Sequence, residues 1–318
     1  MKVLVTGATS LLAGTTVRHL RFRGHEVVVL QRRPCGLDVE EHLADIRDAA
    51  AVRRAGEGCD VIIHAAARVG ITGTAAEFAS VNVDGTVNVV GLARSTGAAI
   101  VYVSSPSVAH RGHPLVAAPA TPAVVDHKAH YPATKARAEL LVLACTDIAT
   151  TALRPHLVWG PGDTQFVGRI VERARTGRLV LIGGGSVLVD TTYLTNAADA
   201  LVAAAEGLHL GAAFVHRPVV VANGEPRPIR EIVERICRAG GVPFHPRSVR
   251  LPVARAAGSV AERLWRRGEP PITRFVADQL GTAHWFDPTE ARRLLGWEPR
   301  ITLEEGFDLL EAASRPPS

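Results

Sequence analysis

Short apolar runs alternate along the chain with longer stretches of helical periodicity. The apolar runs cover about 2–6, 26–31, 60–64, 99–104 and 150–158. Apolar runs of about four to eight residues between turn signals are typical of strands buried on both faces. The stretches between them are long enough for crossover helices, which join parallel strands in a right-handed sense. We therefore predict an α/β fold built on a doubly wound parallel sheet.

The order of these runs also divides the chain. We predict a dinucleotide-binding domain over residues 1–162, to which 180–222 returns, and a smaller substrate-binding lobe over 223–318, joined by 163–179. Ligands of such sheets bind beyond the carboxyl ends of the strands. The lobe is therefore expected to cover that edge.

A glycine turn follows the first apolar run, at Thr6-Gly7-Ala8-Thr9. Backbone N–H groups at such a strand-to-helix turn receive a pyrophosphate. A complete G-x-x-G-x-x-G turn would carry glycine where this chain has Ser10 and Ala13. Alanine is a mild change, but the Cβ of Ser10 fills space where backbone should approach the phosphates, or its hydroxyl donates to a phosphate oxygen. We expect weakened or rearranged dinucleotide binding by Gly7, Thr9, Ser10, Leu11 and Leu12.

The end of the second apolar run bears on the choice of dinucleotide. NAD-selective sites place an acid there to accept from the ribose hydroxyls, whereas a 2′-phosphate favours arginine. This chain reads Leu30-Gln31-Arg32-Arg33, with no acid. The pattern favours NADP(H) over NAD(H), although NAD(H) is not ruled out. The alternative is that one arginine only stacks on adenine or faces solvent.

Tyr131 and Lys135 stand four residues apart, and on a helix that spacing puts them side by side on one face. An adjacent ammonium favours the phenolate and lowers a phenol pKa from about 10 towards the working pH of a general acid. A serine from the cluster Ser104-Ser105-Pro106-Ser107 could hold a carbonyl oxygen against that phenol. The alternative is a surface lysine beside a half-buried tyrosine on an amphipathic helix.

Five further blocks accompany this pair: Asp60–Ala67, Asn82–Thr86, Val101–Ser105, Leu153–Asp163 and His284–Pro299. With the glycine turn they resemble, in order and almost from end to end, the extended short-chain dehydrogenase/reductases of the NAD-dependent epimerase/dehydratase superfamily. Within that group the chain resembles the branch of 3β-hydroxysteroid dehydrogenases and 2-alkyl-3-ketoalkanoate reductases. The resemblance implies a Rossmann-type sheet with a smaller C-terminal substrate-binding lobe, and a homodimer.

The resemblance also implies roles for individual residues. Ser105, three residues before Val108, would polarise the carbonyl. Tyr131 would donate the proton, and Lys135 would lower the tyrosine pKa and bind the nicotinamide ribose. Further cofactor contacts are expected from Asp45, Ile46, Ala65, Ala66, Ala67, Asn82, Pro155 and Val158. Substrate contacts are expected from Gln165 and Phe166, for which packing is an equal alternative, and from His156, which points either into the core or towards the nicotinamide.

The implied function is reduction of a ketone, or oxidation of an alcohol, in a hydrophobic substrate resembling a steroid, a ketoalkanoate or a polyketide. Three alternatives stay open. One is a non-redox cyclase or dehydratase, which Ser10 and Ala13 favour; another is a nucleotide-sugar epimerase or dehydratase. The third is a regulatory protein that only senses dinucleotide, against which the intact Ser–Tyr–Lys set argues.

Composition excludes several classes of protein. The net charge is +5, but acidic and basic residues are interspersed and form no nucleic-acid-binding arm. No apolar stretch reaches the roughly 20 residues that span a bilayer, and a strand starting at residue 2 leaves no room for a signal peptide. The four cysteines are scattered, as in a reducing compartment, and no metal-ligand spacing occurs. Arginine supplies almost all of the positive charge, and together with the abundant Ala, Gly and Pro this suggests a gene from a high-G+C bacterium. We expect a cytoplasmic enzyme of secondary metabolism.

Overall fold

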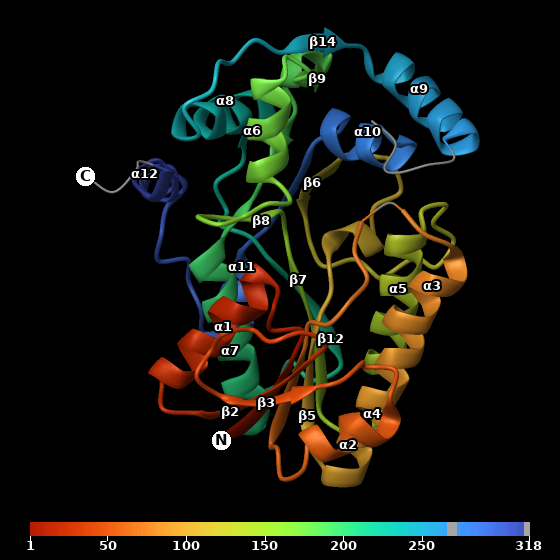
Figure 1. Ribbon diagram of the computed structural model, residues 1–318, viewed down its shortest axis with the longest axis vertical. Coiled ribbons are helices and arrows are strands. Elements are labelled where there is room, and N and C mark those ends of the chain that lie inside the picture. Colours follow the sequence, from red (N-terminus) through yellow and green to blue (C-terminus); the bar gives the residue numbers. More distant parts are fainter. Residues whose placement is uncertain (71, 266–271, 315–318) are drawn as a thin grey trace.

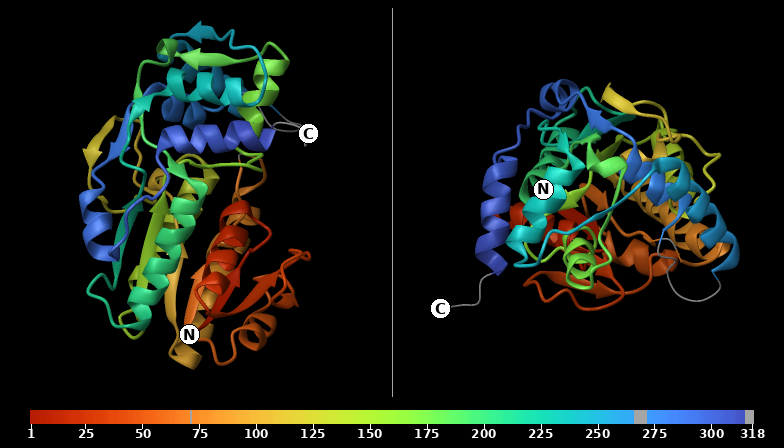
Figure 2. Two further views of the ribbon diagram at one scale, coloured as in Figure 1. Left: turned by 90° about the vertical axis from the view of Figure 1, so that its left-hand side faces the viewer. Right: turned by 90° about the horizontal axis from the view of Figure 1, so that it is seen from above.

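The computed structural model of the protein describes residues 1–70, 72–265 and 272–314. Figure 1 shows two parts, a parallel sheet flanked by helices and a smaller lobe above it. The side view in Figure 2 shows that the lobe stands over one end of the sheet.

Within the described residues the main sheet has seven parallel strands, in the order β12-β7-β5-β4-β1-β2-β3. The strands are β1 (Lys2–Thr6), β2 (Glu26–Gln31), β3 (Glu40–Leu43), β4 (Val61–His64), β5 (Ala99–Val103), β7 (Thr150–Pro155) and β12 (Arg217–Val221). The strand order reverses between β1 and β4, and ligands bind at such a reversal in doubly wound sheets. The predicted fold class is confirmed.

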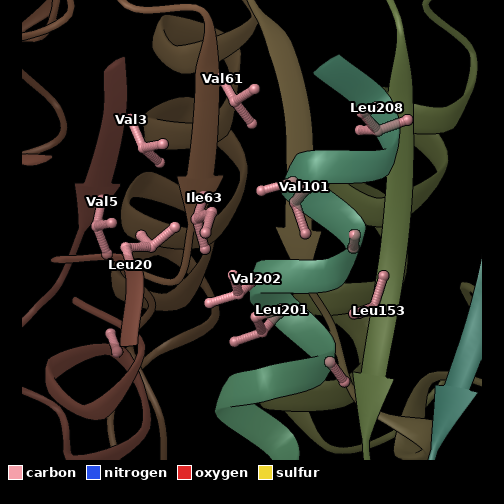
Figure 3. Close-up of a cluster of buried hydrophobic side chains, with 14 of the residues drawn as sticks. Val3, Val5, Leu20, Val61, Ile63, Val101, Leu153, Leu201, Val202 and Leu208 are labelled. Carbon is pink, nitrogen blue, oxygen red and sulfur yellow. The ribbon is translucent and has the colours of Figure 1, made fainter. Parts of the chain in front are cut away.

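Helices cover both faces of this sheet (Figure 1). One face carries α1 (Leu11–Phe22), α7 (Leu194–His209) and α11 (Thr289–Leu295); the other carries α2 (Ala49–Ala55), α4 (Gly85–Thr96) and α5 (His130–Leu143). Alternate strand residues feed the two cores: Val3 and Val5 pack towards α1 and α7, and Leu4 packs towards α2 and α4. Figure 3 shows the first of these cores. Both faces are apolar, as expected of buried parallel strands.

The lobe is built from helices and three small sheets. Its helices are α6 (Val167–Arg175), α8 (Ile229–Ala239), α9 (Leu251–Leu264), α10 (Arg274–Gly281) and α12 (Leu303–Ser314). Its strands are β6 (Leu115–Ala118), β8 (Val158–Trp159), β9 (Val180–Ile182), β10 (Leu188–Val189), β11 (Thr192–Tyr193), β13 (Arg227–Pro228), β14 (Arg247–Val249) and β15 (His284–Phe286). In the described residues they pair as β13-β10-β15-β6, β11-β8 and β14-β9. Short turns of helix also occur at α3 (Ala75–Ala79), η1 (Ser80–Asp84), η2 (Pro106–Val108) and η3 (Gly183–Gly185).

Two features differ from the sequence expectation. The segment from residue 180 was expected to return to the main sheet, but β9 pairs with β14 and β10 pairs with β13 and β15, all within the lobe. The chain rejoins the main sheet only with α7 and β12. Strand β6 precedes the predicted boundary at 162, yet it pairs with β15 in the lobe. Among the helices of the described residues, none has the length and apolar character needed to cross a bilayer.

Candidate active site

Tyr131 lies in the first turn of α5, and Ser105 follows the end of β5. The Ser105 hydroxyl is near enough to the Tyr131 phenol to favour the phenolate. Burial raises the pKa of Tyr131 to about 12, and the contact with Ser105 opposes that rise. The neighbouring hydroxyl of Ser107 donates to Ser105 Oγ at 2.9 Å. The side chain that meets the phenol is thus that of Ser105, the serine chosen from the sequence.

Lys135 lies one turn after Tyr131 and is only 2% exposed. Its ammonium donates to the carbonyl oxygen of Val103 at 2.6 Å and lies 4.0 Å from the centre of the Tyr102 ring. Burial lowers the pKa of Lys135 to about 7, while the charge of Glu139 opposes this. The expected lowering of the Tyr131 pKa is not seen in this arrangement, because the cost of burying a phenolate is the larger effect.

Glu139 continues the same face of α5 by one more turn. Its carboxylate accepts from both Nε and Nη2 of Arg154 on β7, with Nε at 2.9 Å. It also accepts from the hydroxyl of Ser104, at 2.5 Å. Arg154 Nη1 donates in turn to the carbonyl oxygen of Thr121, at 2.6 Å. This buried network joins α5, which carries Tyr131 and Lys135, to β7 and to the end of β5, which leads to Ser105.

A second network starts at His64, which is fully buried at the end of β4. Its Nδ1 lies 2.8 Å from Thr6 Oγ1 and its Nε2 lies 3.0 Å from Thr86 Oγ1. Thr6 Oγ1 accepts from the backbone N–H of Ala66, and Thr86 Oγ1 donates to the carbonyl oxygen of Asn82. Only the neutral Nε2–H tautomer satisfies every bond. Burial lowers the pKa of His64 to about 3, in agreement with a neutral ring.

Asn82 was expected to contact the cofactor, and its side chain binds the backbone of Arg68. Its side chain accepts from Arg68 N at 2.7 Å, donates to Arg68 O at 3.1 Å, and donates to Thr134 Oγ1 at 3.0 Å. Thr134 lies between Tyr131 and Lys135 on α5. Asn82 therefore ties the loop after β4, with Ala65, Ala66 and Ala67, to the helix of the candidate acid.

The turn after β1 accommodates both of its departures from glycine. Gly7 has φ +77°, and a Cβ there would lie 2.9 Å from the Cα of Ala66, so only glycine fits. Ser10 has φ −77° and ψ 148°, a backbone that any residue adopts, and its Oγ accepts from Ala13 N at 3.3 Å as the N-cap of α1. Ala13 is fully buried against the sheet. Neither residue disrupts the turn.

A cavity of about 180 Å³ lies beside this turn, at the reversal of the strand order. Ten of the predicted cofactor residues line it: Gly7, Thr9, Ser10, Arg32, Arg33, Asp45, Ile46, Ala65, Ala66 and Ala67. Leu11 lines an adjoining cavity of about 400 Å³, while Leu12 packs against the core. Pro155 and Val158 flank Leu157, at the end of β7 and the start of β8.

Gln31 also lines the 180 Å³ cavity, where the sequence pattern expects an acid in NAD-selective proteins. Its Nε2 donates to Glu41 Oε1 at 2.5 Å, while its own Oε1 is buried without a partner. An unpartnered acceptor suits a ribose hydroxyl, and the two guanidinium groups of Arg32 and Arg33 suit a phosphate. The lining of this cavity therefore suits the adenosine end of a dinucleotide.

Two further cavities bear on the substrate: one lies between α5 and the lobe helices α9 and α10, and the other lies within the lobe. Tyr131 lines one of about 520 Å³, together with Phe78, His130 and Phe275. Gln165 and Phe166, the predicted substrate residues, line the other, of about 280 Å³, which is mostly apolar.

His156 differs from its expected role. It is 4% exposed, and its Nε2 lies 2.8 Å from Nδ1 of His284, so it lies in the core behind the cavity wall. His284 lines the apolar cavity instead. Both imidazoles have pKa values lowered by burial.

Comparisons with known proteins show the family and the fold. The profile of the 3-beta hydroxysteroid dehydrogenase/isomerase family matches residues 16–242. A 2-alkyl-3-oxoalkanoate reductase of Stenotrophomonas maltophilia is 43% identical, over 99% of this chain and 99% of that protein. A 3-beta-hydroxysteroid dehydrogenase of Mycolicibacterium neoaurum is 30% identical, over 96% of this chain and 89% of that protein. The crystal structure of a short-chain dehydrogenase/reductase superfamily protein from Agrobacterium tumefaciens with bound NAD matches with a TM-score of 0.77 at 19% identity, over 98% and 97% of the two chains.

Proposed function

Since the chain belongs to the 3-beta hydroxysteroid dehydrogenase/isomerase family, we propose that it is an NADP(H)-dependent reductase of a hydrophobic ketone, with Ser105, Tyr131 and Lys135 at the reacting carbonyl. The 43% identical relative is named for 2-alkyl-3-oxoalkanoates, and a ketone of that kind is the substrate we favour. The reverse oxidation of the alcohol uses the same groups. A homodimer and a location in the cytoplasm stay predictions.

The fit of the 180 Å³ cavity supports the cofactor assignment. Gly7, Thr9 and Ser10 would hold the pyrophosphate, Arg32 and Arg33 the 2′-phosphate, and Asp45 and Ile46 the adenosine. Lys135 would meet the nicotinamide ribose. Bound there, NADPH supplies the hydride for the carbonyl carbon.

Side chains of the protein bind and protonate the carbonyl oxygen. Ser105 donates a hydrogen bond to that oxygen and holds it against Tyr131, whose phenol the Ser105 hydroxyl already influences. As negative charge develops on the oxygen, Tyr131 transfers its phenolic proton to it and the alcohol forms. Lys135, with a pKa of about 7, is poised to carry the positive charge that stabilises the phenolate left behind. Solvent then restores the proton.

The placement of Ser105, at the end of β5, beside Tyr131 of α5 carries this proposal, and replacing Tyr131 tests it. Tyr131→Phe removes one hydroxyl and keeps the ring, so reduction of a 2-alkyl-3-oxoalkanoate should fall by about 10²–10⁴. NADPH affinity, measured by fluorescence titration, should stay nearly unchanged. Tyr193→Phe is the matched control, because Tyr193 is buried against Trp159 in the lobe core. A Tyr131→Phe enzyme as active as Tyr193→Phe would refute the mechanism.

The same assay separates the non-redox alternative. A cyclase or dehydratase would form product without NADPH and would consume none. Because Ser10 caps α1 and Ala13 packs in the core, the two residues that favoured this alternative have a structural explanation. We expect no product when the cofactor is left out.

A further inference from the structure

We propose that the 280 Å³ apolar cavity binds one alkyl chain of the substrate, and that its closed inner end sets how long that chain can be. This proposal rests on the proposed function for the position of the ketone. Binding alone, however, is enough to test it.

The Tyr131 cavity and the apolar cavity share a wall. Phe275, in the first turn of α10, lines both the cavity that contains Tyr131 and the apolar one. Its neighbours divide between them, since Thr273 lines the first cavity and Ile272 and Val276 line the second. A ketone held at Tyr131 therefore has a second compartment beside it, on the far side of one aromatic ring.

The apolar cavity also begins at the reacting edge of the sheet. Leu157 lines it, two residues after the end of β7, and its backbone is left-handed at φ +40°. Such a backbone is strained for a branched residue and is kept at sites where it serves binding. Leu157 thus connects the carboxyl edge of the sheet, where the nicotinamide is expected, with the cavity in the lobe.

The rim and the inner end of this cavity differ in character. Gln165 and Arg169 are exposed at the rim, whereas Ile170, Ile182, Ile229 and Val233 at the inner end are each less than 10% exposed. These inner residues come from α6, β9 and α8, which enclose that end of the lobe (Figure 1).

The one imidazole in the wall offers no free ring nitrogen. His284 Nε2 donates to the carbonyl oxygen of Gln279, so in the neutral ring Nδ1 accepts from Nε2 of His156. The imidazole thus offers a ligand no partner, and the four inner residues Ile170, Ile182, Ile229 and Val233 favour hydrocarbon over polar groups, which would lose water without gaining a partner there.

The volume points to part of a ligand and not to a whole one. Pockets for complete small ligands have about 300–1,000 Å³. At about 280 Å³ the apolar cavity is slightly below that range, and the adjoining Tyr131 cavity adds about 520 Å³. Both cavities are filled when one long, flexible chain of the substrate lies in the smaller cavity and the rest of the substrate lies at Tyr131.

Straight-chain alkan-2-ones from 2-hexanone to 2-dodecanone test this directly. Calorimetric titration, with and without NADP⁺, would give Kd for each chain length without turnover. We expect Kd to fall about fourfold per added methylene, equivalent to about 0.8 kcal/mol, until the chain reaches the inner end, and then to stop falling. A series with no dependence on chain length would overturn the proposal.

Val276→Phe fills the cavity from α10, and Val253→Phe makes the same change on the exposed face of α9, where Val253 is 58% exposed. In Val276→Phe, Kd should stop falling at a chain about two methylenes shorter than in the wild type. This variant should bind 2-dodecanone about fifteenfold more weakly, and its Kd for 2-hexanone should change little. The control should match the wild type. If Val276→Phe does not fold, Val276→Leu should show the same effect at about fourfold.

A Val276 variant that folds and follows the wild-type series would exclude the chain from this cavity. Failure of the proposed function has another signature: alkanones would bind with the expected profile, but neither they nor a 2-alkyl-3-oxoalkanoate would be reduced.

Discussion

Glu139 and Arg154 face each other across α5 and β7 as a two-point ion pair, with both side chains only 1% exposed. A pair this deeply buried adds little net stability over an apolar pair, but breaking it leaves a charge without water or partner. Its geometry matters more than its energy. Because Ser104 and Thr121 bond to the same two side chains, the pair fixes the distance from the helix of Tyr131 to the strand that leads to Ser105.

We expect Glu139→Gln to reduce the free energy of unfolding by roughly 3–5 kcal/mol, because the amide cannot neutralise Arg154. Glu304→Gln breaks the ion pair of Glu304 with Arg235, which lies at the surface, and should cost far less. Urea denaturation measures both. The double variant Glu139→Leu/Arg154→Leu should recover much of the loss. Equal effects of the two single variants would contradict this account of the buried pair.

Lys135 should make stability depend on pH. Burial lowers its pKa to about 7, while an unfolded lysine titrates near about 10.4. Between these values the unfolded chain holds a proton that the folded chain lacks, so stability rises with pH. Relative to Lys135→Met, the cofactor-free wild type should gain up to ~1.4 kcal/mol per pH unit from pH 7 to pH 10. A difference that stays constant over this range, in urea denaturation at each pH, would be evidence against a depressed lysine pKa.

Arg32 and Arg33 should determine the preference between the two dinucleotides. Replacing both with alanine removes charge-assisted bonds to the 2′-phosphate, each worth about 1.5–3 kcal/mol, so NADPH should bind at least about tenfold more weakly. NADH affinity should change much less. Arg53→Ala/Arg54→Ala removes the same charge from the exposed end of α2 and is the control. If NADPH and NADH weaken equally, these arginines do not select the cofactor.

Ser10 should respond differently to glycine and to alanine. As the N-cap of α1 it should cost about 1 kcal/mol of stability when replaced by alanine, but only a few tenths when replaced by glycine. We expect Ser10→Gly to tighten NADP(H) binding, because the Cβ no longer occupies the space beside the phosphates. Ser10→Ala keeps that Cβ and should not tighten it. Should both variants weaken binding by about 1–2 kcal/mol, the hydroxyl donates to a phosphate oxygen instead.

The main sheet could be predicted because its signal is local. The apolar runs at 2–6, 26–31 and 99–104 match β1, β2 and β5, with apolar residues facing both helix layers. The run at 150–158 was predicted as one strand, but it divides into β7 and β8 at Leu157. That break is a left-handed backbone at a non-glycine residue, which composition does not reveal.

In the candidate site, too, local relationships could be predicted from the sequence and contacts between distant residues could not. The spacing of Tyr131 and Lys135 predicted a shared helix face, and Glu139, four residues further on, could have been added by the same rule. The partners of His64, in contrast, come from β1 and α4, and those of His156 come from β15. Sequence spacing holds no information on contacts between residues so far apart. It therefore left the direction of His156 open and did not place His284 in the cavity wall.

The pairing of β6 with β15 bears on how the chain folds as it is made. Leu115 pairs with His284, so the first of these strands leaves the ribosome long before its partner. At about 5–20 residues per second, that wait is on the order of ten seconds. Until then the edge of β6 that pairs with β15 stays open, and strands of other nascent chains can join it. Aggregation during synthesis should therefore depend on the segment around residue 115, whereas the apolar compartment of the lobe closes only after the last of the pairing strands has emerged.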